Sequence, residues 1–373
     1  MTSTPIQTRE DLQFYLQVAI QLEHATIPPY LTGLYSIKPD DAKPNLDAYN
    51  IIRAVLVEEM LHLTLSANML NAIGGKPSLT APGFVPSYPA HLPNGETDFE
   101  VGLGKFSRDA IDTFLKIERP KPPAPSKANV LREGVTYLRH QDLHAGRKSG
   151  RGLLPAFKTT SESGEALHLH FETIGEFYKA IAAGFTSLAE KLGEKELFTG
   201  DPTRQVGPEY YYSGGGEITR VVSLKTALDS IELISEQGEG GVHGIDDFEG
   251  ELSHYYRFDQ ISKARYYVVD KDKPEKPTGP ALTIHWDAVY PVVSNAKLSM
   301  YPVGSDLHAR AVDFNKQYGT FLKLLEEALN GRPDRLNAAF AGMFRIKQAA
   351  LELIRNPLPD GSGNAAPTFE ISP

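Results

Sequence analysis

The sequence contains no cysteine among its 373 residues. Without thiols the chain can form no disulfide, no cysteine-ligated iron–sulfur cluster and no thiolate metal site, and it has no cysteine nucleophile. Any metal ion that the protein binds must therefore be held by nitrogen and oxygen atoms. This absence directs the search for a site to histidine and carboxylate side chains.

The sequence also shows no long apolar run, no long basic run and no recognisable signal peptide. No uninterrupted apolar stretch approaches the roughly 20 residues that cross a membrane, and the N-terminus has no basic region followed by an apolar run. The net charge of −9, with no compensating basic run, argues against a general nucleic-acid binder. We expect a cytoplasmic protein with neither a nucleic-acid nor a membrane partner, and we leave a homodimer open.

The remaining composition is that of an ordinary globular protein, with 41% hydrophobic and 23% charged residues. We expect one domain over residues 1–373, built on helices with an apolar stripe of period 3.6. Four bundle helices are predicted at about 9–35, 46–73, 163–192 and 246–263. A proline-rich insertion at 76–160 should cover the bundle, and the other predicted helices lie near 107–118, 223–237, 306–329 and 333–355, the last two being additional C-terminal helices.

Two of the bundle helices carry the pattern Glu-x-x-His on their apolar stripe. One pair is Glu59 and His62, and the other is Glu251 and His254. Residues three apart lie on one face of a helix. A carboxylate and an imidazole are costly to bury there without a partner, and a metal ion is a partner that accepts both. Both pairs are therefore predicted to bind metal.

The pattern occurs a third time, at Glu165 and His168. About one such pair is expected by chance in a chain of this composition. This third pair stands at the start of a predicted helix where a single glutamate is needed, so we interpret it as unrelated to the site. Helical phase supports the other two pairs.

Single glutamates are predicted to complete the site. Glu23 interrupts the apolar stripe of the first helix from within it. On the third helix, Glu172 and Glu176 share a face beside the main stripe, and periodicity does not choose between them. One glutamate on each of two helices and Glu-x-x-His on each of two others is how ferritin-like bundles hold two metal ions. The sequence therefore predicts an all-α, ferritin-like four-helix bundle.

Several segments resemble one known family, the ferritin-like domains named for iminophenyl-pyruvate dimer synthase. They are LEHATIPPYL (22–31), VEEMLHL (57–63), TIGEFYKAI (173–181), ELSHYYRF (251–258), AVYPV (288–292) and APTFE (366–370). The resemblance covers essentially the whole chain and implies a set of six metal ligands. They are Glu23, Glu59, His62, Glu176, Glu251 and His254. The choice of Glu176 over Glu172 comes from this resemblance alone.

The resemblance and the ligand types together predict a non-heme dinuclear oxidoreductase. Two iron ions are expected, with manganese as the alternative, because carboxylates and imidazoles suit both metals. The expected substrates are dioxygen and a small amino-acid-derived or nitrogen-containing metabolite of secondary metabolism. The family's pathway enzymes are much longer than this chain, so their dimerisation reaction is not carried over. The alternative is a metal-binding or ferroxidase-type protein without an organic substrate, which would not need the proline-rich cover.

Overall fold

The computed structural model describes residues 6–39, 44–120, 171–210, 215–240, 245, 250–268 and 276–371. Several sequence predictions fall outside these ranges. They are residues 121–160 of the insertion, the pair Glu165 and His168, the predicted helix start at 163–170 and residues 246–249 of the fourth bundle helix.

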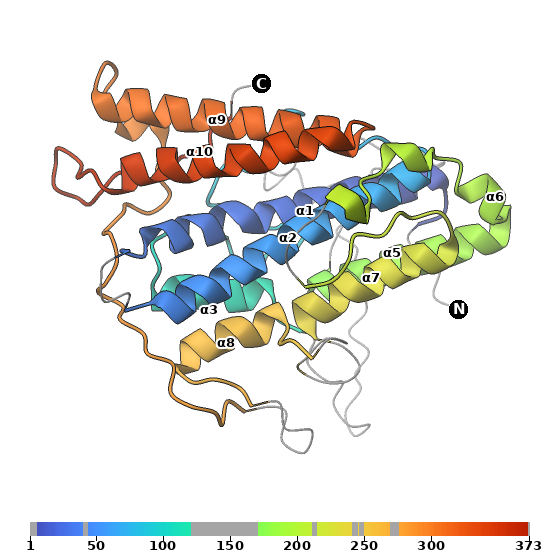
Figure 1. The fold of residues 1–373 in the computed structure, drawn as a ribbon, viewed down its shortest axis with the longest axis horizontal. Helices are drawn as coiled ribbons and strands as arrows, with labels where there is room; N and C mark the ends of the chain where they lie inside the picture. The colour runs from blue at the N-terminus through green and yellow to red at the C-terminus, as the bar shows by residue number, and fades with distance from the viewer. Residues whose placement is uncertain are drawn as a thin grey trace.

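Two long helices, α1 (Arg9–Ser36) and α2 (Leu46–Ala72), pack side by side through the middle of the molecule (Figure 1). Helix α1 begins at a capping box, in which Asp11 N–H donates to Thr8 Oγ1 at 3.0 Å and Thr8 N–H donates to Asp11 Oδ2 at 2.9 Å. Both helices are buried on nearly every face. A helix buried in this way lies inside the fold, so polar residues on α1 and α2 need partners there.

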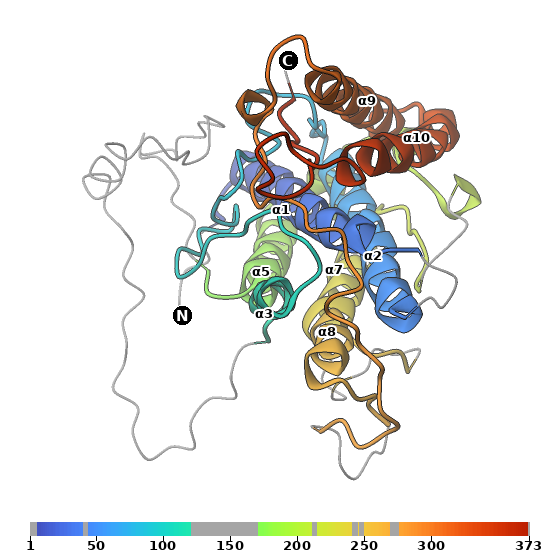
Figure 2. The ribbon, with the colours of Figure 1, turned by 90° about the vertical axis from the view of Figure 1, so that its left-hand side faces the viewer.

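Two further rods run along this central pair, and each consists of two helices. One rod combines α5 (Ile174–Leu192) with α3 (Arg108–Ile117), and the other combines α7 (Leu224–Glu239) with α8 (His254–Lys263). Viewed along the bundle, α3 lies in line with α5 and α8 lies in line with α7 (Figure 2). The packing of α5 on α7 and of α3 on α8 completes the four-rod bundle.

This arrangement corrects two predicted helix boundaries. Helix α5 begins at Ile174, with Thr173 as its N-cap, rather than near residue 163, because Thr173 Oγ1 accepts the Glu176 N–H at 3.1 Å. Helix α8 begins at His254 rather than near 246. Glu251 therefore precedes the helix and does not share a helix face with His254.

A hairpin of α9 (Asp306–Leu329) and α10 (Leu336–Ile354) lies against the other side of α1 and α2 (Figure 1). These are the two predicted C-terminal helices, except that Pro333–Arg335 forms a separate 3₁₀ turn. A four-residue helix, α6 (Glu194–Leu197), follows α5. The described residues contain isolated β-bridges but no strand, so the prediction of an all-α fold is confirmed.

The described part of the predicted insertion packs on α1. The Gln17 amide binds the backbone of Ser78 twice, at 2.8 and 2.9 Å, and Gln21 Nε2 donates to the Gly83 carbonyl at 2.9 Å. These bonds satisfy buried amides on α1 and fix the loop over the helix. Among the described residues, no helix combines the length and apolar character needed to cross a membrane.

Candidate metal centre

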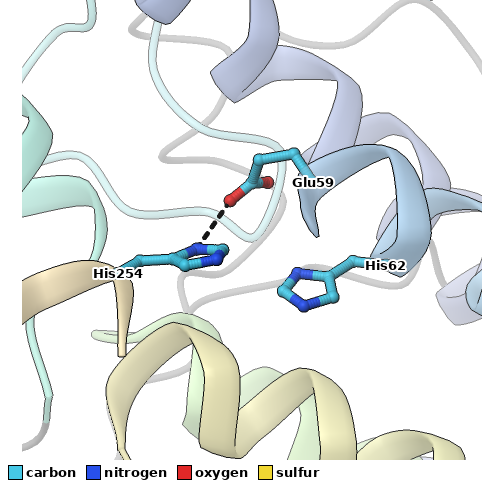
Figure 3. A group of neighbouring side chains, drawn as sticks. All are labelled: Glu59, His62 and His254. Carbon is cyan, nitrogen blue, oxygen red and sulfur yellow. Dashed lines mark ion pairs between the residues drawn. The ribbon is translucent and has the colours of Figure 1, made fainter. Parts of the chain in front are cut away.

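Glu59 and His62 of α2 face His254 across the bundle interior (Figure 3). Each offers one ligand atom, and these atoms lie within 4.8 Å of one another. Glu59 Oε1 is 2.9 Å from His254 Nδ1, and the two imidazole rings stack with centroids 5.3 Å apart. All three residues are at most 2% exposed. The α2 pair thus meets a histidine from a distant part of the chain, as the sequence predicted for His254.

Glu23 of α1 joins this group from the side of His62. Its Oε2 atom lies 3.5 Å from His62 Nδ1, and the side chain is buried. One turn later on α1, Thr26 Oγ1 donates to Glu59 Oε2 at 2.9 Å. Helix α1 therefore supplies one carboxylate and orients a second.

Glu118, which sequence analysis missed, joins the group from the side of His254. It is the C-cap of α3, it is buried, and its Oε2 atom lies 3.6 Å from His254 Nδ1. A sequence signal existed, because Glu118 continues the apolar stripe of Ile111 and Phe114 at helical spacing. We name the five residues Glu23, Glu59, His62, Glu118 and His254 the Glu–His cluster.

Two buried tyrosines donate hydrogen bonds to Glu118 and Glu23, which we call the terminal carboxylates. Each tyrosine binds the carboxylate oxygen that does not face a histidine. Tyr30 Oη donates to Glu118 Oε1 at 2.5 Å, and Tyr178 Oη of α5 donates to Glu23 Oε1. Burial, reinforced by the neighbouring carboxylate charge, raises the pKa of both phenols well above the ordinary value. Both tyrosines therefore stay protonated and hold each carboxylate with its other oxygen toward a histidine.

The predicted ligands Glu176 and Glu251 lie outside the Glu–His cluster. Glu176 is half-buried in the first turn of α5, where its Oε2 accepts the N–H of the exposed Glu172 at 3.2 Å. The Glu251 side chain is 53% exposed, and its Oε2 accepts from Arg257 at 2.9 Å. Their assignment as ligands stays a prediction that this geometry does not support.

Each cluster histidine is held from outside through Nε2. His254 Nε2 lies 2.9 Å from Glu58 Oε2, and His62 Nε2 lies 3.0 Å from Gln237 Oε1. Because these partners are oxygen acceptors, we assign a ring hydrogen to Nε2 in both residues, so that Nδ1 is the ring nitrogen that faces the carboxylates and would bind a metal ion. Glu58, the residue before Glu59 on α2, is itself buried behind His254.

The electrostatics of the Glu–His cluster call for cations. Burial, together with the charge of Glu118, raises the pKa of Glu59 to about 8. Burial alone would lower the pKa of His254, but its contacts with Glu118, Glu58 and Glu59 raise that pKa well above the ordinary value. Buried carboxylates this close together are stable only with protons or cations among them.

The donor set also fits metal ions. Within the described part of the chain, His254 Nδ1 is buried without a hydrogen bond, although carboxylate oxygens lie 2.9 and 3.6 Å away. Three carboxylates and two imidazoles with inward Nδ1 atoms match the nitrogen and oxygen ligands of a dinuclear site. A family model described as ferritin-like matches residues 16–263, which include the whole cluster.

The chain belongs to the ferritin-like family.

Two similar proteins support this membership. Over 427 aligned residues the chain is 26% identical to dichlorochromopyrrolate synthase of Lentzea aerocolonigenes, covering 99% of this chain and 37% of that protein. The chain thus spans just over a third of that relative's length. A crystal structure of a ferritin-like protein from Caulobacter vibrioides matches with a TM-score of 0.58 and 23% identity, covering 99% of this chain and 100% of that one. The ferritin-like fold and the resemblance drawn from the sequence are therefore confirmed.

Proposed function

We propose that the Glu–His cluster binds two metal ions, iron or alternatively manganese, and that this ferritin-like protein is a dioxygen-dependent oxidoreductase. The main support for this proposal is that five buried side chains with ligand atoms converge. The two imidazoles among them both direct Nδ1 toward the carboxylates. His62 and Glu23 would hold one ion, His254 and Glu118 the other, and Glu59 would lie between them. Bound iron would supply Lewis-acid and one-electron redox chemistry with dioxygen.

The chain's own side chains would orient this site and keep water out. Tyr30 and Tyr178 keep their protons at Oη and fix the direction of Glu118 and Glu23. Thr26 fixes Glu59 in the same way. Since every ligand is at most 3% exposed, charges in the site interact in a medium of low dielectric constant and are screened little by solvent.

The substrate that we propose is a small amino-acid-derived or nitrogen-containing metabolite of secondary metabolism. The support is the similarity to a protein whose name denotes a synthase of an organic compound. That name favours turnover of an organic substrate over the alternative, a metal-binding or ferroxidase-type protein. Because the chain spans 37% of that relative, the relative's own reaction is not assigned to this protein.

The test is anaerobic loading with Fe(II), followed by metal analysis and addition of oxygen. Two iron ions per chain are expected, with oxygen uptake that depends on them. The double variant His62→Ala, His254→Ala should bind neither ion, whereas His91→Ala, which removes an exposed histidine, should bind both. Protein free of iron and manganese after loading would contradict the proposal, and a cage-sized assembly storing many ions per chain would support the ferroxidase alternative.

A further inference from the structure

We propose that the two metal positions are unequal, and that the one built on His254 binds its ion more tightly and fills first. The inference rests on the proposed two-ion site. We name the positions by their histidines: the His254 position uses Glu118, the His62 position uses Glu23, and both share Glu59.

The inner ligands of the two positions are nearly equivalent. Each has one imidazole Nδ1 and one terminal carboxylate, with contacts of 3.6 Å between His254 and Glu118 and 3.5 Å between His62 and Glu23. Each terminal carboxylate gives its other oxygen to a buried tyrosine. If only these ligands acted, the two positions would therefore bind a metal ion with similar affinities.

The outer partners of the histidines differ in charge. His254 Nε2 faces the carboxylate of Glu58, whereas His62 Nε2 faces the neutral amide of Gln237. A carboxylate that accepts the outer N–H of a ligating histidine makes the ring a stronger donor to the metal, and an amide does so less. The His254 position is thus the stronger of the two.

The outer partners also differ in how firmly they are held. Both oxygens of Glu58 are bonded, one to His254 and the other to Arg257 NH1 at 2.9 Å. The amide of Gln237 is buried, and among the described residues its Nε2 has no hydrogen-bond partner, so one bond there orients the amide toward His62. His254 is therefore better preorganised for a metal ion than His62.

The same chain of contacts gives Glu251 a role. Its carboxylate binds Arg257 NH2 at 2.9 Å, and Arg257 Nε also donates to the Leu252 carbonyl at 2.5 Å. Glu251 thereby helps to place the guanidinium against Glu58. In this scheme Glu251 is a positioning residue at the outer end of the row Glu251–Arg257–Glu58–His254 rather than a ligand.

The test is an anaerobic titration with Mn(II), in which unbound Mn(II) is counted by its electron paramagnetic resonance signal. Wild-type protein should show two binding events that differ at least about tenfold in affinity. Glu58→Gln should weaken the tighter event about 10- to 100-fold and leave the weaker one in place. Gln237→Glu should strengthen the weaker event and narrow the gap.

Three further variants control the assignment. His254→Ala should abolish the tighter event, and Glu251→Gln, at a half-exposed position, should weaken that event less than Glu58→Gln does. Glu209→Gln, which breaks an exposed ion pair with Arg220, should change neither event. Circular dichroism and thermal melting confirm that each variant is folded.

The outcomes separate this inference from the proposed function. Two events of equal affinity in wild-type protein would overturn the inequality while leaving the two-metal site intact. Equal weakening of both events by Glu58→Gln would do the same. Absence of any Mn(II) or Fe(II) binding by the folded wild-type chain would instead overturn the proposed function.

Discussion

At the residue scale, Glu118 occupies an unfavourable place for a negative charge. It is the C-cap of α3, and the C-terminal end of a helix carries a partial negative charge that destabilises a carboxylate. The side chain is buried as well. The hydrogen bond from Tyr30 and the approach of His254 offset part of this cost, and a bound cation would offset more.

Comparing Glu118→Gln with Glu176→Gln tests which of these glutamates is the third carboxylate ligand, beside Glu23 and Glu59. The Glu118 variant removes a charge 3.6 Å from His254 Nδ1, so Mn(II) affinity of the tighter position should fall at least about tenfold. The Glu176 variant changes a half-buried group in the first turn of α5 and should leave both affinities within about twofold. The anaerobic Mn(II) titration described above measures the affinities of both variants. A loss confined to Glu176→Gln would restore the ligand set implied by the family resemblance.

At the scale of elements, the interruption of two rods creates the centre. The C-terminal ends of α3 and α7, the first two turns of α5 and the first turn of α8 supply Glu118, Gln237, Tyr178 and His254. The junction of α5 and α7 is fixed by Gly175, whose N–H donates to Glu239 Oε1 at 2.6 Å. Helix ends thus bring together side chains from four separate segments.

Gly175→Ala should loosen this junction. A Cβ at Gly175 would overlap the Glu239 carboxylate, which cannot withdraw without losing the Gly175 N–H. Overpacking of this kind costs about 1–3 kcal/mol of unfolding free energy. Gly238→Ala is the matched control. A Cβ added at Gly238 would have its nearest neighbouring atom, Glu118 Oε2, 3.9 Å away, and alanine is more favourable than glycine in a helix by up to about 1 kcal/mol. Urea unfolding of both variants measures the difference, and equal stabilities would contradict the prediction.

Thr8→Ala should destabilise α1 at its N-terminus. The change removes the hydroxyl that accepts the Asp11 N–H at 3.0 Å, and loss of such a cap costs about 1 kcal/mol. The same substitution at the half-buried Thr113 of α3, whose hydroxyl donates to the Asp109 carbonyl of the same helix, should stay within about 0.5 kcal/mol. Both values come from urea unfolding, and a Thr8 variant as stable as wild type would show that the cap is not needed.

At the scale of the whole molecule, the Glu–His cluster connects the central helix pair, α1 and α2, with α3 and α8, which belong to the two outer rods. Its members come from α1, α2, α8 and the end of α3, and the view along the bundle shows the two rods on one side of the central pair and the α9–α10 hairpin on the other (Figure 2). An ion held by these elements binds the folded chain and not the unfolded one. Metal binding should therefore stabilise the whole bundle.

Metal removal should lower the melting temperature. At a free Mn(II) concentration a hundred times the dissociation constant, binding to one position adds about 2.7 kcal/mol to the free energy of unfolding. Protein stripped with a chelator should accordingly melt at a lower temperature than protein with Mn(II). The variant His62→Ala, His254→Ala should melt at the same temperature in both conditions, whereas identical melting curves for the wild type would mean that the folded state binds no Mn(II).

The sequence was most informative where the signal is local. Helices α1 and α2 follow the predicted ranges closely because long apolar patterns with caps determine a helix by themselves. Glu59 and His62 were recognisable because they are polar residues on a buried face. For Glu251 the local pattern predicted one helix shared with His254, but the chain enters α8 only at His254.

The sequence by itself determined which ligand types a metal site could use and which class of fold to expect. The lack of cysteine limits any metal site to nitrogen and oxygen ligands, and helical periodicity with buried Glu and His indicates a ferritin-like bundle. Only the tertiary structure decided that Glu118 meets His254 and that Glu58 and Gln237 hold the two imidazoles from outside. These contacts join different helices, and such meetings depend on how the helices pack rather than on the spacing of residues within any one of them.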